Sequence, residues 1–417
     1  MNYFFDQHFH LMDISHPNLL SFFNSIESGI TELFTSGALL PTYIITPKNR
    51  RSHTLTHRIT NTLTTFEQSI GKTLVMMEDD LLGRFSSQES KDSSQPYIRD
   101  AKLHFRSRTY DRIALAPMLM DFSAPEGAEK SSYYPIAQRE RIFTYIEDTL
   151  AGFAYYQEQR PDGLFSFFPF VGINPPSHSL ATIEHMLATY VVTKKQPANG
   201  ERQFYGIKVY PPLGFDPWPK EEEERAKVEA IYHFCTTYGI PIMTHCDDQG
   251  FRGLPAKEAW RVSEPDAWKP VLANYPLLQI DFAHFGKQYT PLQKNPLTVL
   301  SGLAHKVPDS SWFYQIIELM HHYPNVYADV SFSGAHEDFY SELATYLLSL
   351  EEEQQQRLKG RILFGTDFAV NLMKVESYSA YYRIFENSPF TDEEIHAFVQ
   401  TNPLQYMGWQ SGRRMSP

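Results

Sequence analysis

The sequence predicts an α/β protein: a (β/α)8 TIM barrel with a long helical insertion after the first strand. Eight short runs of apolar, β-branched or aromatic residues punctuate its 417 residues, and amphipathic stretches with helical spacing follow most of them. Eight alternating units is the number that closes such a barrel. An open doubly wound sheet would also alternate, but no G-x-G-x-x-G follows the first run.

The predicted strands are the segments in which apolar residues run almost without a break. In chain order they are residues 3–11, 112–122, 164–173, 204–210, 241–245, 277–284, 326–332 and 362–368. The stretches between them read as helices because their apolar residues recur every three to four positions. Several of these stretches end at a glycine or just before a proline, as helices commonly do.

The first two predicted strands are separated by about a hundred residues, far more than a normal connection between a strand and a helix. We expect residues 13–110 to form a helical cap on the barrel, with an exposed loop at 86–96 (SSQESKDSSQP). A barrel needs about 250 residues. Barrel and cap together account for the length, so residues 1–417 are predicted to be one domain.

The composition restricts the partners of the protein. Its net charge is −12, from 37 Lys and Arg against 49 Asp and Glu, which argues against nucleic-acid binding, where a basic surface supplies most of the affinity. Two cysteines cannot make a disulfide framework and indicate a reducing compartment. We find no signal peptide and no apolar run long enough to cross a bilayer. We therefore expect a cytoplasmic protein without nucleic-acid or membrane partners.

The strongest chemical signal is the segment Asp6-Gln-His8-Phe-His10 in the first predicted strand. Alternate side chains of a strand share one face, so Asp6, His8 and His10 are expected to point the same way. Two imidazoles at this spacing can chelate one metal ion, and Asp6 can support them as an outer carboxylate. An H-x-H pair among 16 histidines can also arise by chance, so its weight depends on what accompanies it.

Three further polar residues stand at the ends of predicted strands. His245 ends the run PIMTH, His284 ends QIDFAH, and Asp367 ends ILFGTD. The C-terminal ends of barrel strands carry the active site, whereas a structural residue at such a position is more often apolar. Four strands that each bring a ligand-type residue to one rim are hard to explain by chance. The sequence therefore predicts a metal site there.

Several longer motifs occur in order along these strands. They are D-x-H-x-H (6–10), G-I-K-V-Y-P-P (206–212), T-H (244–245), W-K-P-V-L-A-N-Y-P (268–276), A-H-F-G (283–286), F-G-T-D (364–367) and T-N-P-L-Q-Y-M-G (401–408). With these motifs the sequence resembles the amidohydrolase superfamily, in the branch of the amidohydrolase-related hydrolases and the aminocarboxymuconate-semialdehyde decarboxylase-like enzymes. The resemblance covers the first strand and the chain from the fourth strand onwards, and the long insertion has no counterpart in it.

The resemblance implies a ligand set for one divalent metal, made of His8, His10, His245 and Asp367. Zinc is the metal we favour, with manganese as an alternative. The resemblance also implies that His284 contacts the substrate. A divalent cation lowers the pKa of its water towards neutrality, and Asp367 can accept that proton and pass it to a leaving group. A protonated His284 can stabilise an oxyanion or a substrate carboxylate.

Lys208, in the motif G-I-K-V-Y-P, has two interpretations. In two-metal members of the superfamily a lysine of the fourth strand is carboxylated and bridges both ions. The form of the motif resembles that of single-metal members, in which the lysine stays cationic near the substrate, and we favour this role. A lysine that only pairs with a barrel carboxylate is the structural alternative.

Two reactions fit this predicted site. The first is hydrolysis of an amide, ester or lactone of a small molecule by a metal-activated water. The second is a metal-dependent, non-oxidative decarboxylation of an aromatic or enoic carboxylic acid, for which Lys208 or Arg252 would bind the substrate carboxylate. A non-catalytic barrel is disfavoured, because every expected ligand is retained. The resemblance also suggests a homodimer, since barrels of this kind commonly pair.

Overall fold

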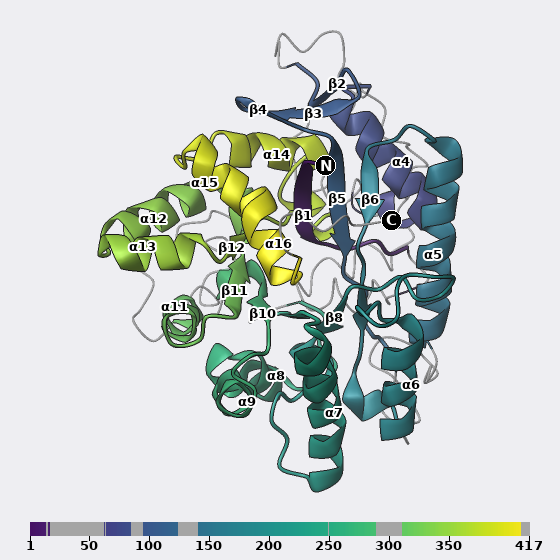
Figure 1. The fold of residues 1–417 in the computed structure, drawn as a ribbon, viewed down its shortest axis with the longest axis vertical. Coiled ribbons are helices and arrows are strands. Elements are labelled where there is room, and N and C mark those ends of the chain that lie inside the picture. The colour runs from purple at the N-terminus through teal and green to yellow at the C-terminus, as the bar shows by residue number, and fades with distance from the viewer. Residues whose placement is uncertain are drawn as a thin grey trace, which may run out of the picture.

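The computed structural model describes residues 1–13, 16, 62, 64–84, 95–123, 141–248, 250–288 and 311–409 (Figure 1). Two sheets of parallel strands form its centre. One consists of β1 (Tyr3–Phe9), β5 (Arg112–Pro117) and β6 (Phe165–Phe167). The strands of the other, from one edge to the other, are β12 (Ile362–Leu363), β11 (Val326–Asp329), β10 (Ile280–Phe282), β9 (Ile242–Thr244), β8 (Gly206–Val209) and β7 (Phe170–Gly172).

Backbone hydrogen bonds connect the two sheets at both of their borders. At the first, β6 leads directly into β7, and the amide of Leu119, just beyond β5, donates to the carbonyl of Phe170 (3.0 Å). At the second, the amide of Gln7 in β1 donates to Phe364 O (2.9 Å), and Thr366 N donates to His8 O (3.0 Å). The eight predicted strands are therefore all present, the third being divided into β6 and β7, and the fold is the predicted (β/α)8 barrel.

Helices lie around the outside of the strands (Figure 1). They are α5 (Arg141–Gln159), α6 (Leu180–Tyr190), α7 (Glu222–Tyr238), α8 (Ala256–Ser263), α9 (Lys269–Asn274), α11 (Trp312–His322), α12 (Glu337–Leu348), α13 (Glu352–Lys359), α14 (Tyr378–Glu386), α15 (Asp392–His396) and α16 (Asn402–Tyr406). Helix α7 illustrates how the sequence sets their ends. Three glutamates occupy its first turn, where the helix dipole favours negative charge, and Gly239 closes it with φ 66°.

The described part of the long insertion contains both a helix and a small sheet. Helix α4 (Ile70–Leu81) packs against α5, with Ile70 against Gly152. The antiparallel strands β2 (Ile98–Arg99), β3 (Lys102–Phe105) and β4 (Arg108–Tyr110) follow. They lie beside the start of β1, where the rings of Phe105 and Tyr110 are 5.1 and 5.3 Å from that of Phe4.

This small sheet was not part of the predicted helical cap. The turn between β2 and β3 places Asp100 and Ala101 at positive φ (50° and 55°), as in a tight hairpin turn, but it lacks the glycine that usually announces such a turn. The sheet lies at the N-terminal end of the barrel, away from the predicted site. Residues 17–61, the largest stretch of the predicted cap, lie outside the described residues, as do residues 86–94 of the loop predicted at 86–96. The cap therefore stays a prediction.

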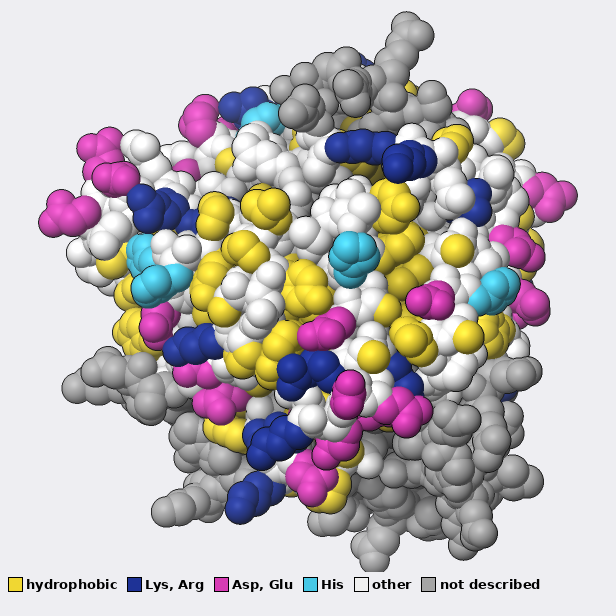
Figure 2. All heavy atoms as spheres, turned by 60° about the horizontal axis from the view of Figure 1, so that its bottom comes forward, with side chains coloured by type: hydrophobic (Ala, Val, Ile, Leu, Met, Phe, Trp, Pro, Cys, Tyr) yellow, Lys and Arg dark blue, Asp and Glu magenta, His cyan; other side chains and the backbone are white. Residues whose placement is uncertain are grey.

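Apolar side chains fill the barrel below its C-terminal rim. Four parallel strands, β1, β9, β11 and β12, contribute one buried cluster that includes Tyr3, Phe5, Met243, Tyr327 and Leu363. Among the described residues, no helix combines the length and the apolar character needed to cross a membrane. On the face seen in Figure 2, acidic and basic side chains are interspersed with apolar ones, and no single basic patch gathers there.

Candidate metal centre

Three of the four predicted metal ligands lie together at the C-terminal rim. His8 lies near the end of β1, His10 directly follows that strand, and Asp367 follows β12. His10 Nε2 is 3.3 Å from both His8 Nε2 and Asp367 Oδ1, and His8 Nε2 is 3.8 Å from the same carboxylate oxygen. None of the three residues is more than 4% exposed. Each offers one ligand atom, and these atoms lie within 4.8 Å of one another.

The hydrogen bonds of the two imidazoles show that this cluster fits a cation. His10 Nδ1 lies 2.9 Å from the carbonyl oxygen of Met118, which can only accept, and His8 Nδ1 lies 2.8 Å from the carboxylate of Asp329. In both rings Nδ1 therefore donates, and in the neutral ring Nε2 carries a lone pair. Burial and the nearby charge of Lys208 lower the pKa of His8 to about 3. Two lone pairs and a carboxylate oxygen thus face one another, an arrangement that a bound cation stabilises.

The fourth predicted ligand, His245, lies in a neighbouring cluster. His245 Nε2 is 3.0 Å from Asp247 Oδ1, and these two residues form a second group of potential ligands with His284. The His245 ring stacks on Tyr210 at 4.1 Å and lies 5.2 Å from the His284 ring. The His284 ring is in turn 5.0 Å from that of His8. The structure therefore places His245 beside the three-residue cluster but does not bring its ring nitrogen into it.

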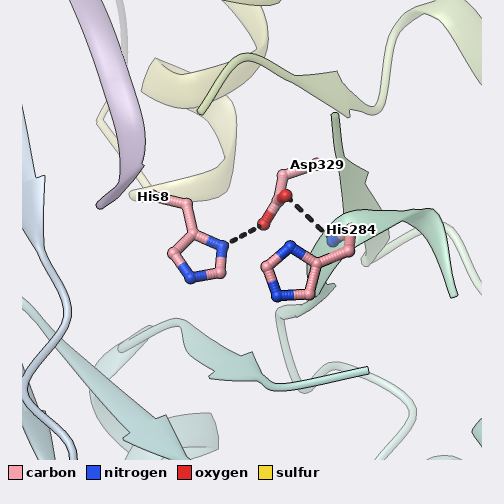
Figure 3. Close-up of side chains that lie close together, drawn as sticks. All are labelled: His8, His284 and Asp329. Carbon is pink, nitrogen blue, oxygen red and sulfur yellow. Dashed lines mark hydrogen bonds and ion pairs between the residues drawn. The ribbon is translucent and has the colours of Figure 1, made fainter. Parts of the chain in front are cut away.

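Asp329, at the end of β11, joins the two clusters and was not among the predicted site residues. One of its carboxylate oxygens accepts from His8 Nδ1, and the other accepts from the backbone amide of His284 at 3.0 Å (Figure 3). The side chain of Ser331 also donates to Asp329. The sequence contains a signal for Asp329. It ends the apolar run VYAD, a position where an aspartate is unusual, just as Asp367 ends ILFGTD.

His284 is buried, and Ser331 holds its ring through one nitrogen. Its Nδ1 lies 3.2 Å from the carbonyl of Ser331 and 2.9 Å from the hydroxyl of the same residue. Burial lowers the pKa of His284, against the opposing effect of Asp367 and other carboxylates. The neutral ring is therefore favoured, whereas the role expected from the sequence requires a protonated one.

Lys208 extends from β8 into the centre of this arrangement. Its Nζ is 3.4 Å from His8 Nε2, and the residue is 1% exposed. Burial lowers the pKa of Lys208 to about 8, while the surrounding carboxylates, Asp329 first and then Asp367, oppose that shift. Among the described residues, no carboxylate oxygen lies within 4.0 Å of the ammonium group. Lys208 is therefore next to the ligand cluster without being engaged in a close ion pair there.

A second lysine, Lys287, lies at the same rim and was not among the site residues predicted from the sequence. Lys287 follows His284 by three residues, and its Nζ lies 5.0 Å from the centre of the Phe332 ring. Burial and the charge of Lys374 lower the pKa of Lys287 to about 7, and Asp247 and Asp367 act in the opposite direction. Arg252, the other cation considered for a substrate carboxylate, lies in the loop after β9 and is partly buried.

The irregular path of β1 explains the position of Asp6. The pairing of β1 with β5 shifts register between Asp6 and Phe9. Before this shift, Asp6 lies on the same side of the strand as Phe4, facing α14, where it binds Thr366 and Tyr378. After the shift, His8 and His10 face the site. The expectation that Asp6 points the same way as both histidines is therefore wrong, because a bulge re-aims the side chains that follow it.

Two site residues adopt backbone conformations that are unusual for residues other than glycine. His284 has φ 60° and Asp367 has φ 59°. Such conformations are costly and concentrate at functional sites, where the surrounding structure holds them in place. Gly365 contributes to this packing, because a Cβ at this position would lie 2.7 Å from the Cβ of His8. The chain after β12 therefore approaches β1 more closely than a side chain would permit.

The amidohydrolase family matches residues 140–408 of the chain. None of the curated proteins compared with the chain matches it. Among solved structures, 5-carboxyvanillate decarboxylase from Novosphingobium aromaticivorans, in complex with manganese and 4-hydroxy-3-methoxy-5-nitrobenzoic acid, is similar at 14% identity and a TM-score of 0.49, over 98% of this chain and 96% of that one.

Two further solved structures are similar over nearly their whole length. A probable 2-pyrone-4,6-dicarboxylic acid hydrolase from Acinetobacter baumannii has 10% identity and a TM-score of 0.45, over 98% of this chain and 100% of that one. The 4-oxalomesaconate hydratase from Rhodopseudomonas palustris has 11% identity and a TM-score of 0.43, over 97% of this chain and 95% of that one.

Proposed function

The chain belongs to the amidohydrolase family, and from this premise we propose that it is a metal-dependent, non-oxidative decarboxylase of an aromatic or enoic carboxylic acid. His8, His10 and Asp367 are the ligands that we assign to one divalent metal, and His245 in the neighbouring cluster is the fourth ligand that we propose. The metal would act as a Lewis acid towards an oxygen of the substrate. Zinc and manganese both suit a site of two to three imidazoles and one carboxylate.

The observation that carries this proposal is the position of Lys208. Its ammonium group is buried, lies 3.4 Å from His8 Nε2, and makes no ion pair within 4.0 Å among the described residues. A buried ammonium group is costly unless anions compensate it, and the carboxylates around Lys208 do so only from beyond 4.0 Å. A substrate carboxylate bound beside the metal would supply that anion, whereas a neutral amide or ester would not. The need for a negatively charged substrate group beside Lys208 favours decarboxylation of an acid over hydrolysis of a neutral amide or ester.

The surrounding residues suit the remaining requirements of the reaction. Loss of carbon dioxide leaves an electron pair on carbon, which an aromatic ring or an enoic system can delocalise, and one proton must then add to that carbon. We assign this transfer to Asp367, which stands 3.3 Å from His10 Nε2 at the same rim and would first take the proton from a water molecule. The site residues are almost entirely buried, so bulk water is kept out and the substrate carboxylate loses most of the hydration that stabilises it.

A panel of substrates tests the proposal directly. Protein loaded with zinc or with manganese would be incubated with hydroxybenzoic acids and enoic acids, and separately with amides, esters and lactones, while both carbon dioxide and acid release are measured. We expect carbon dioxide from at least one carboxylic acid and an equal amount of the protonated product. Hydrolysis of a member of the second group without release of carbon dioxide would instead establish the hydrolase alternative.

A further inference from the structure

We infer that Asp6 is a positioning residue for the metal site, because it fixes the backbone segment that carries Asp367. The inference rests on the ligand set proposed above, in which Asp367 binds the metal. Asp6 lies on the other side of β1 from the ligand cluster, is 0% exposed, and faces α14. It therefore acts on the site through an intermediary and not by direct contact with metal or substrate.

The intermediary is Thr366, the residue before Asp367. Thr366 donates twice to the carboxylate of Asp6, through its backbone amide at 2.9 Å and through its hydroxyl at 2.7 Å. The hydroxyl of Tyr378 donates the third hydrogen bond to Asp6 at 2.9 Å and accepts one from Tyr382 at 3.0 Å. Asp6, Thr366, Tyr378 and Tyr382 are all buried. The network is thus shielded from competing water and strengthened by its low-dielectric surroundings.

These hydrogen bonds hold the backbone on both sides of Asp367. The Thr366 hydroxyl accepts from the amide of Phe368 at 3.2 Å, and the Thr366 carbonyl accepts from the side chain of Asn371 at 2.7 Å. The amide of Asp367 itself donates to the carbonyl of His8 at 2.8 Å. The φ of 59° at Asp367 is unfavourable in isolation, so this conformation requires such external support.

The choice of a carboxylate at position 6 supports a role in positioning. A buried carboxylate is costly, and a fold that needed only filled space there could use an apolar side chain. Only a group with several acceptor sites can take the amide and hydroxyl of one residue together with a tyrosine hydroxyl. Asp6 therefore behaves as a rigid anchor, and its effect at the site is to set where the Asp367 oxygen lies relative to the two imidazoles.

The test uses variants that weaken the anchor without touching a metal ligand. Thr366→Val removes one hydrogen bond to Asp6 and keeps the backbone amide, whereas Thr366→Ser keeps both. Tyr378→Phe removes the hydrogen bond from α14. The matched control is Tyr232→Phe, since the hydroxyl of Tyr232 is also buried and donates to a backbone carbonyl, that of Pro217, at 2.8 Å. The probe is Mn²⁺ alone, titrated into chelator-treated protein and followed by electron paramagnetic resonance and by calorimetry.

We expect Thr366→Val and Tyr378→Phe to weaken Mn²⁺ binding by about 10- to 100-fold, the range typical for partners that orient a metal ligand. Thr366→Ser should restore binding, and Tyr232→Phe should bind like the wild type although its thermal unfolding midpoint falls as much as that of Tyr378→Phe. Unchanged affinity in Thr366→Val and Tyr378→Phe would overturn the inference and leave the proposed ligand set intact. Absence of Mn²⁺ binding to the wild-type protein would overturn both.

Discussion

At the scale of single residues, the site is defined by which ring nitrogen of each histidine already makes a hydrogen bond within the protein. Asp329 and the carbonyl of Met118 occupy Nδ1 of His8 and His10, so that both Nε2 atoms face Asp367. The chain therefore fixes the ring orientations before any metal arrives. Such preorganisation lowers the entropic cost of binding, and it makes the outer partners of the rings nearly as important as the ligands themselves.

Lys208 provides a residue-scale test of how the substrate binds. If its ammonium group holds a substrate carboxylate, Lys208→Met removes a charged hydrogen bond worth about 1.5–3 kcal/mol, and kcat/KM should fall about 10- to 100-fold, mainly through KM. The matched control is Lys227→Met, because Lys227 is also buried but pairs with Glu224 on α7 at 2.6 Å. Steady-state kinetics that give both variants the same KM would contradict the assignment of Lys208.

At the scale of elements, the sequence predicted the strands well because their signals are local. Nearly unbroken apolar runs mark β8 to β12, and polar residues at their ends mark the rim. The side of β1 on which Asp6 lies could not be predicted in this way, since it depends on a register shift against β5. Asp329 ends its strand as Asp367 does, but no family motif and no neighbouring histidine marks it in the sequence.

The contact between the end of β12 and β1 leads to an element-scale prediction. Gly365→Ala would place a Cβ 2.7 Å from the Cβ of His8 and 3.0 Å from its backbone nitrogen, so one of the two segments must shift. We expect a loss of about 1–3 kcal/mol in the free energy of unfolding, together with weaker metal binding. In the control Gly360→Ala, the added Cβ comes no closer than 3.3 Å to its nearest neighbour, Gln356 O.

Denaturant titration and Mn²⁺ titration of both glycine variants separate the two effects. A Gly365→Ala protein that is destabilised but binds Mn²⁺ like the wild type would show that the shift is absorbed by the segment after β12 and does not reach His8. Equal behaviour of the Gly365 and Gly360 variants in both measurements would contradict the close approach described here.

At the scale of the whole molecule, metal binding should appear as thermal stability. A ligand that binds only the folded state at 100 times its Kd adds about 2.7 kcal/mol, and for a protein of 417 residues we expect the unfolding midpoint to rise by about 3 °C. Differential scanning calorimetry of chelator-treated protein, before and after addition of zinc or manganese, measures this shift. His8→Ala and Asp367→Asn should fold without it, and they should also lack metal-dependent turnover.

The exposed His185 on α6 gives the control for that experiment. His185→Ala should retain the full shift, because a surface histidine contributes nothing to the proposed centre. Metal analysis of the same samples counts the ions bound to each chain. One ion per chain agrees with a cationic Lys208, whereas two ions together with a carbamate on its amine would establish the bridged, two-metal alternative.

The border at which β1 meets the chain after β12 also has a consequence for how the protein is made. Asp6 and Thr366 are hydrogen-bonded although they are 360 positions apart in the sequence. His8 and Asp329, which are also hydrogen-bonded, are 321 positions apart. A ribosome therefore exposes the two histidines long before it has synthesised the carboxylate that they require. Until the last strand is added, the nascent chain holds an incomplete and weakly chelating pair, so tight uptake of the metal must follow synthesis of the barrel and cannot guide its early folding.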